Sequence, residues 1–170
     1  MRIFLTGMMG CGKSFWAKKI AGAGNMHFAD SDKYIESKMS MSIKDIFDQK
    51  GEVYFRILES QCLKEIILEN ENCIIATGGG TPCFHNNMDL LKKSGKVFYF
   101  KTDISVLAKR IMNYAEDRPL INTATIEETE KELARILSDR KNIYEQSDVI
   151  IDMNQIDEAN FAENFIKNYV

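Results

Sequence analysis

Residues 7–14, with the sequence GMMGCGKS, have the composition and spacing of a loop that binds phosphate groups. Glycine tolerates backbone angles that other residues resist, so such a loop can curl until several N–H groups point at one phosphate. Lys13 would reach the β- and γ-phosphates of a nucleotide, and Ser14 would offer its hydroxyl to Mg²⁺. The alternative is a glycine-rich turn that binds nothing. The apolar run at residues 2–6 and the helical pattern after Ser14 favour the phosphate site.

Two carboxylates, Asp30 and Asp32, directly follow the apolar run of residues 26–29. One could hold Mg²⁺, and the other could accept a proton from a hydroxyl nucleophile. The alternative is a structural role, since Asp and Ser are favoured at helix N-termini and a helix over about residues 31–38 is expected. Because a phosphate-binding loop is predicted beside them, we interpret the pair as a metal-binding acid and a catalytic base.

Three consecutive glycines, Gly78, Gly79 and Gly80, end the apolar run of residues 73–77. Their N–H groups could meet a ligand that comes close to the backbone, and a flexible turn is the alternative. Many phosphate-loop proteins place a magnesium-binding Asp at the end of a central strand. Since this run ends in glycines, Asp30 becomes the leading candidate for that role.

Two arginines occupy positions that predict burial. Arg140 lies at helical spacing from Leu133, Leu137 and Tyr144, so a guanidinium interrupts an apolar stripe. A buried arginine needs an anionic partner, which could come from the protein or from a ligand. Arg56 has a glutamate four residues before it and another three residues after it, so a salt-bridged helix face explains it as well as a ligand does.

The stretch of residues 113–125 is polar and lies between two helical patterns. A mobile loop that covers a phosphate site is one use for such a segment, and a plain surface connection is the alternative. Arg118, within it, could stabilise the charge of a transferred phosphoryl group. Arg110 lies on the preceding helix, where simple solvent exposure would also explain it.

Five short apolar runs alternate with helical segments along the chain, and this alternation predicts a parallel sheet that is covered on both faces. Ligand sites in such sheets form at the carboxyl ends of the strands. The runs are residues 2–6, 26–29, 73–77, 97–100 and 149–152.

The composition fits one domain over residues 1–170, with an apolar content of 45%. A net charge of −3 argues against nucleic acid as a partner, and no apolar run approaches the ~20 residues of a membrane span. The four cysteines form no C-x-x-C pair, and the start of the chain does not read as an export signal. These features predict a cytoplasmic protein.

In order and spacing, the motifs resemble those of the shikimate kinases over nearly the whole chain. The similar segments are residues 7–14, 28–32, 42–47, 51–59, 77–80, 118–121 and 140–144. Two segments depart from the family pattern on the substrate side: Met39-Ser40-Met41, where the family often has a glycine, and Thr81-Pro82-Cys83 after the glycines.

The resemblance implies a nucleoside-monophosphate-kinase-like α/β fold: a three-layer α/β/α P-loop kinase with a five-stranded parallel sheet in the order 2-3-1-4-5. It implies a substrate-binding region at about residues 31–62 and a lid at about residues 112–125. The implied reaction moves the γ-phosphoryl group of ATP, with Mg²⁺, to the 3-hydroxyl of shikimate. We also expect the protein to be a monomer. The alternatives are a kinase for another small carboxylate-bearing hydroxy compound and a non-catalytic nucleotide-binding regulator.

The resemblance also implies a role for each candidate residue. Asp32 would be the base and hold the substrate hydroxyls, with Lys13 and Arg118 as the other catalytic groups, and Ser14 and Asp30 would hold Mg²⁺. The nucleotide would contact Gly10, Cys11, Gly12, Lys13, Ser14, Phe15, Arg110 and Arg118. The substrate would contact Asp32, Arg56, Gly78, Gly79, Gly80 and Arg140.

Overall fold

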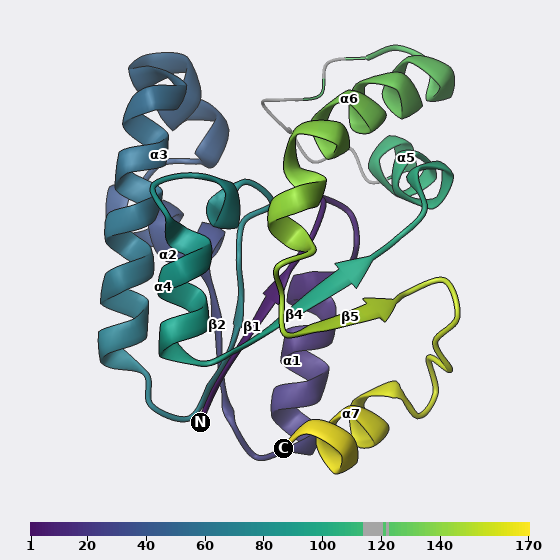
Figure 1. Ribbon diagram of the computed structural model, residues 1–170. Helices are drawn as coiled ribbons and strands as arrows, with labels where there is room; N and C mark the ends of the chain where they lie inside the picture. The colour runs from purple at the N-terminus through teal and green to yellow at the C-terminus, as the bar shows by residue number, and fades with distance from the viewer. Residues whose placement is uncertain (114–120, 122) are drawn as a thin grey trace.

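A computed structural model describes residues 1–113, 121 and 123–170. Five parallel strands form one sheet in the order β2-β3-β1-β4-β5, with helices on both of its faces (Figure 1). The expected three-layer architecture and strand order are therefore confirmed. The strands are β1 (Arg2–Thr6), β2 (His27–Asp30), β3 (Cys73–Ala76), β4 (Lys96–Lys101) and β5 (Val149–Asp152).

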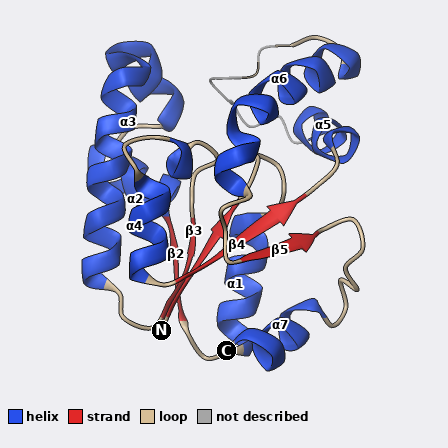
Figure 2. Ribbon diagram, viewed as in Figure 1, coloured by secondary structure: helices blue, strands red, loops and turns tan. Residues whose placement is uncertain are grey.

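The helices follow the strands in the alternation that the apolar pattern predicts (Figure 2). They are α1 (Lys13–Ala23), α2 (Ser31–Met39), α3 (Ile43–Glu69), the 3-10 turn η1 (Thr81–Cys83), α4 (Asn87–Ser94), α5 (Ile104–Asn113), α6 (Ile126–Tyr144) and α7 (Phe161–Tyr169). The expected strand limits differ from the observed ones by one residue at some ends, the usual uncertainty of such boundaries.

The central strand β1 buries side chains on both of its faces. Ile3 and Leu5 pack into the cluster that includes α1 and α7, whereas Phe4 packs into the cluster that includes α3 and α4. Successive side chains of a strand point to opposite faces, so a strand covered on both sides must be apolar throughout. This is the physical reason for the unbroken apolar run at residues 2–6.

The carboxyl ends of β1, β2 and β3 lie at one edge of the sheet, and this places the three predicted site segments side by side (Figure 1). The backbone of Thr77 continues the pairing by donating to the Leu5 carbonyl at 3.1 Å. Gly7 opens the turn after β1 with a φ of 134°, and a methyl group there would lie 2.7 Å from the Phe100 carbonyl oxygen. Only glycine satisfies both conditions.

Helices α2 and α3 form an arm at the β2 side of the sheet, held by the buried side chains of Ile35, Ile46 and Phe55. The Ser42 hydroxyl caps the start of α3 by accepting from the Asp45 N–H at 3.1 Å. Gly51, with a φ of 80° and a ψ of 167°, interrupts the helical geometry of α3. Helix α3 therefore consists of two helical pieces joined at a kink.

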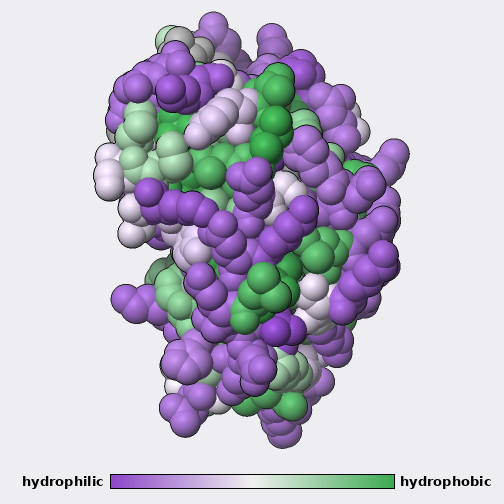
Figure 3. Space-filling model, turned by 90° about the vertical axis from the view of Figure 1, so that its left-hand side faces the viewer, coloured by the Kyte–Doolittle hydropathy of each residue, from purple (hydrophilic) through white to green (hydrophobic). Residues whose placement is uncertain are grey.

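On the side of the molecule where α3 lies, the surface is mainly hydrophilic with separate hydrophobic patches (Figure 3). Helix α3 exposes Val53, Ile57 and Leu68. Across the described parts of the chain, none of the helices has the length and apolar character needed to cross a bilayer.

Ser40 ends α2 in the left-handed conformation, with φ 50° and ψ 36°, in the segment that departs from the family pattern. A side chain in this conformation is strained, and glycine is not. We expect Ser40→Gly to raise the free energy of unfolding by up to about 1 kcal/mol in a denaturant titration. Ser40→Ala is the control, because alanine pays the same backbone penalty. An equal gain from both substitutions would contradict this explanation.

Candidate active site

The phosphate-binding loop forms at the end of β1 and leads into α1. Gly12 precedes the helix in a left-handed conformation, with a φ of 91°. The Lys13 side chain is only 8% exposed, and its Nζ donates to the carbonyls of Gly7 at 2.8 Å and Met8 at 2.9 Å. Arg110 Nη1 approaches the same loop from α5 and donates to the Gly10 carbonyl at 3.3 Å. Two cationic side chains, Lys13 and Arg110, therefore already contact the loop in the absence of a bound anion.

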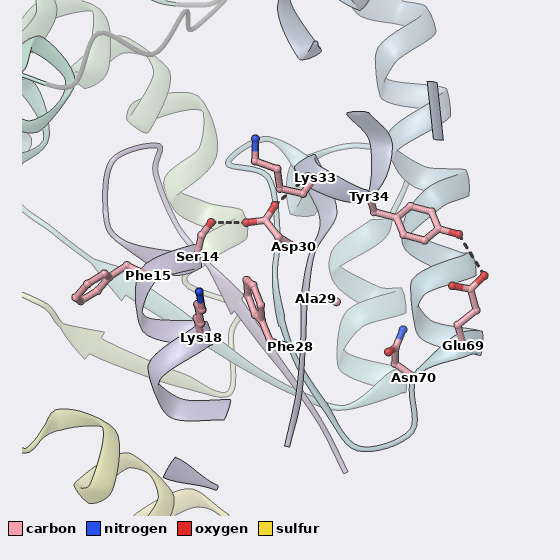
Figure 4. A pocket seen from close by; sticks show the side chains of 10 residues that line it. All are labelled: Ser14, Phe15, Lys18, Phe28, Ala29, Asp30, Lys33, Tyr34, Glu69 and Asn70. Atoms are coloured by element: carbon pink, nitrogen blue, oxygen red, sulfur yellow. Dashed lines mark hydrogen bonds between the residues drawn. The ribbon is translucent and has the colours of Figure 1, made fainter. Parts of the chain in front are cut away.

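Ser14 and Asp30 join the loop to the end of β2. The Ser14 hydroxyl donates to Asp30 Oδ2, and the two side chains point toward one another in Figure 4. Asp30 Oδ1 also caps α2 by accepting from the backbone N–H groups of Asp32 at 3.0 Å and Lys33 at 3.2 Å. Asp30 therefore has the structural role of a helix cap, and it also contacts Ser14.

This pair suits Mg²⁺, which takes oxygen ligands and is usually bound by one or two carboxylates together with substrate phosphates. No group of three or more His, Cys, Asp or Glu side chains able to hold a metal occurs among the described residues. The hydroxyl and carboxylate of Ser14 and Asp30 would therefore hold Mg²⁺ only in combination with a bound phosphate.

A cleft of about 1040 Å³ extends from this pair to α3 and α6. The residues expected at the nucleotide that line it are Gly10, Gly12, Lys13, Ser14, Phe15 and Arg110, and those expected at the substrate are Asp32, Arg56, Gly78, Gly79, Gly80 and Arg140. The side chain of Cys11 is instead fully buried, with Sγ 3.6 Å from Lys13 Nζ. Arg118 and residues 114–120 and 122 of the expected lid lie outside the described residues.

Asp32 lies in the first turn of α2, where its surroundings disfavour the carboxylate. Burial raises the pKa of Asp32 from 3.8 to about 7, the nearby carboxylates of Asp30 and Glu59 add to the rise, and the ammonium of Lys13 opposes it. A carboxyl group whose pKa is close to neutrality can accept a proton at neutral pH and pass it on. This pKa is one of the properties that a general base needs at neutral pH.

The three glycines bring Asp32 and the two arginines into one place. A methyl group on Gly78 would lie 2.6 Å from Asp32 Oδ1, and one on Gly80 would lie 2.5 Å from Arg56 Nη1. One on Gly79 would lie 3.6 Å from Arg140 Nη1. Each successive glycine therefore faces a different polar group of the cleft, and side chains at Gly78 and Gly80 would displace Asp32 and Arg56.

Arg56 already has two carboxylate partners. Its Nη1 donates to Glu59 Oε2 at 2.9 Å, while Nε and Nη2 donate to Glu52 Oε1 at 3.2 Å and 3.0 Å. Glu59 is 1% exposed, whereas the side chain of Glu52 is 47% exposed. The guanidinium also lies over the ring of Phe84, with Cζ 4.3 Å from the ring centroid. The expected intrahelical salt bridges therefore exist, and they hold Arg56 inside the cleft.

Arg140 differs from Arg56. It is 7% exposed, and its Nη1 has no hydrogen-bond partner among the described residues. A buried polar group without a partner is rare in native proteins, and a charged one is costly. Because Arg140 lines the cleft, its open donor is a candidate contact for a bound anion.

Two residues of this site, Tyr144 and Glu59, were not among the site residues predicted from the sequence. Tyr144 donates a short hydrogen bond to the Gly79 carbonyl, which ties the end of α6 to the glycines. The sequence did carry a signal for it, because a tyrosine on an apolar stripe needs a partner for its hydroxyl. Glu59 lines the cleft as well. Its spacing predicted the pairing with Arg56, but its contact with Thr81 follows only from the structure.

A family model described as shikimate kinase matches residues 9–169. The chain belongs to the shikimate kinase family. It is 38% identical over 165 residues to the shikimate kinase of Azobacteroides pseudotrichonymphae, with 97% of each chain covered. It is 41% identical over 161 residues to that of Flavobacterium johnsoniae, with 93% of this chain and 94% of the relative covered.

Solved structures of the family have the same fold. The shikimate kinase of Bacteroides thetaiotaomicron superposes with a TM-score of 0.89 at 33% identity, covering 98% of this chain and 94% of that one. The shikimate kinase of Acinetobacter baumannii, solved in complex with shikimate, gives a TM-score of 0.89 at 31% identity, covering 98% and 90%. Shikimate kinases phosphorylate shikimate with ATP and Mg²⁺, so the expected family, enzyme class and cofactors are confirmed.

The raised pKa of Asp32 predicts a pH-dependent stability. Between pH 3.8 and about 7 the folded chain keeps a proton that the unfolded chain has released, so stability contributed by this group falls as the pH rises through that window. Asparagine stays neutral. We therefore expect Asp32→Asn to stabilise the ligand-free protein, with a gain that grows by about 2 kcal/mol from pH 5 to pH 8.

Urea unfolding at the two pH values measures this gain. Asp48→Asn is the control, because Asp48 is an exposed carboxylate on α3. A gain for Asp32→Asn that is the same at pH 5 and pH 8 would show that burial does not disfavour the ionised carboxyl.

Proposed function

We propose that this chain transfers the γ-phosphoryl group of ATP to the 3-hydroxyl of shikimate, with the cleft at the carboxyl ends of β1, β2 and β3 as its active site. The observation that carries the assignment of the site is the meeting of Asp32, Arg56 and Arg140 at the three glycines. A substrate with both a carboxylate and hydroxyl groups matches two buried guanidinium groups and one basic carboxylate.

At the nucleotide end, Lys13 would leave the carbonyls of Gly7 and Met8 and bind the β- and γ-phosphates. Ser14 and Asp30 would hold Mg²⁺, which when bound neutralises charge that develops on the phosphates. Arg110, already in contact with the loop, would lie beside the nucleotide. These groups supply positioning and electrostatic stabilisation, the main terms in phosphoryl transfer.

At the substrate end, Arg140 and Arg56 would bind the carboxylate and fix the orientation of the ring. Asp32 would accept the proton of the reacting hydroxyl, and its raised pKa supports that role at neutral pH. The division into a substrate-binding region of about residues 31–62 and a lid of about 112–125 remains a prediction. So does the role of Arg118, which lies outside the described residues.

We also propose that the protein acts as a monomer in the cytoplasm. All of the described groups assigned to the reaction come from one chain, so no second copy is needed to complete the cleft. The cosubstrate ATP is a cytoplasmic metabolite, and all four cysteines are free thiols. Analytical ultracentrifugation at the protein concentrations used in the assay tests whether the protein is a monomer.

The decisive assay is the release of ADP from Mg·ATP with shikimate, with quinate and without an acceptor. We expect fast release with shikimate only, together with a product phosphorylated on the 3-hydroxyl. Faster release with quinate would indicate a different hydroxy acid. Binding of ATP with no turnover on either compound would favour a regulatory role instead.

Arg140 provides a sharper test of the substrate end. We expect Arg140→Leu to raise KM for shikimate on the order of 100-fold and to leave KM for ATP nearly unchanged, because the contact is with the acceptor carboxylate. Arg135→Leu on the same helix is the matched control, since Arg135 is exposed and pairs only with neighbouring acids of α6 among the contacts described. Equal effects on both substrates would remove Arg140 from the carboxylate site.

A further inference from the structure

A series of buried hydrogen bonds connects the glycine loop to α3 and α4. The Thr81 hydroxyl donates to Glu59 Oε1 at 2.6 Å, and Asn87 Nδ2 donates to the Thr81 carbonyl at 2.8 Å. Ser60 Oγ in turn donates to Asn87 Oδ1 at 2.8 Å. We call these four residues the Thr81 network. All are nearly inaccessible, with exposures of 0% for Thr81 and Asn87, 1% for Glu59 and 6% for Ser60.

Glu59 joins this network to Arg56. Its Oε1 accepts from Thr81, and its Oε2 accepts from Arg56 Nη1 at 2.9 Å. The two oxygens are thus held by donors from two different parts of the chain, which fixes the plane of the carboxylate. Glu52, the other carboxylate on Arg56, is half exposed, so Glu59 is the buried support of the guanidinium.

Thr81 also lies close to the reacting end of the cleft. A methyl group on Gly78 would be 2.8 Å from Thr81 Oγ1, 2.9 Å from Glu59 Oε1 and 2.6 Å from Asp32 Oδ1, so these three oxygens surround one point. Thr81 lies in the segment that departs from the family pattern. It has none of the catalytic or binding roles proposed above.

We propose that Thr81 is a positioning residue for the acceptor: through Glu59 it holds Arg56 where the guanidinium binds the substrate carboxylate. Without the hydroxyl, Oε1 of a buried carboxylate loses its donor, and an unsatisfied buried charge is costly. Glu59 would then turn to take further N–H groups of Arg56, the same groups that the substrate carboxylate needs. The proposal rests on the proposed function.

The test compares Thr81→Val, which keeps the shape and removes the hydroxyl, with Thr81→Ser, which keeps the hydroxyl. We expect Thr81→Val to raise KM for shikimate about tenfold, with kcat and KM for ATP within about twofold of the parent values. Thr81→Ser should restore KM to within about threefold. Thr102→Val is the matched control, because Thr102 is 7% exposed and its hydroxyl has no partner among the described residues.

Three outcomes would overturn the proposal: an unchanged KM for shikimate in Thr81→Val, an equal rise in KM for ATP, or a similar rise in Thr102→Val. If Thr81→Val does not fold, Ser60→Ala decides, because Ser60 orients Asn87 and thereby Thr81. A rise in KM for shikimate of about threefold supports the network, and an unchanged value overturns it. The parent protein's turnover on shikimate separates these results from a failure of the proposed function itself.

Discussion

The cleft depends on how closely the backbone of Gly78 to Gly80 approaches charged side chains. A Cβ atom at Gly78 or Gly80 would come within 3 Å of Asp32 or Arg56, and one at Gly79 would contact Arg140. Asp32 and both arginines therefore pack against bare backbone. Because the loop follows β3, between β1 and β2, it also holds these groups beside the phosphate-binding loop. Close backbone approach is thus the constraint that unites the two ends of the cleft.

The charges of the cleft are arranged at a cost to the stability of the ligand-free chain. Asp32 is a carboxyl whose ionised form is disfavoured, and Arg140 keeps a buried N–H donor that has no partner in the described part of the chain. Such groups destabilise a fold unless a ligand or the rest of the structure compensates for them. Here the sheet and its two apolar layers supply the compensation. Under the proposed function, the substrate carboxylate would remove part of this cost by pairing with the open donor of Arg140.

Arg56 and Arg140 line the same cleft but differ in the hydrogen-bond partners of their guanidinium groups. Arg56 carries Glu52 and Glu59 on its own helix, so its position is set before a ligand binds. Arg140 has no acidic partner among the contacts described, and its Nη1 donor remains open. Arg56 is therefore held in place by the protein, whereas Arg140 still has a donor that can bind an anion.

The sequence by itself determined the fold and most of the candidate residues that line the cleft. Strand–helix alternation, the spacing of residues 7–14 and the family motifs predicted the sheet order and the segments at its carboxyl edge, because these depend on local patterns and on topology. Whether Arg56 is paired within its helix was left open, since either reading fits the same spacing. The structure shows both glutamates in contact with it.

Only the tertiary structure decided the contacts that depend on distance and burial between remote segments. Examples are the hydroxyl of Thr81 on Glu59, 22 residues away, and the hydroxyl of Tyr144 on the Gly79 carbonyl, 65 residues away. The same holds for the pKa of Asp32, which reflects burial together with the charges of Lys13 and Glu59. Local sequence patterns do not predict the distances between residues that are far apart in the chain. They arise only when packing brings separate elements together and excludes water from between them.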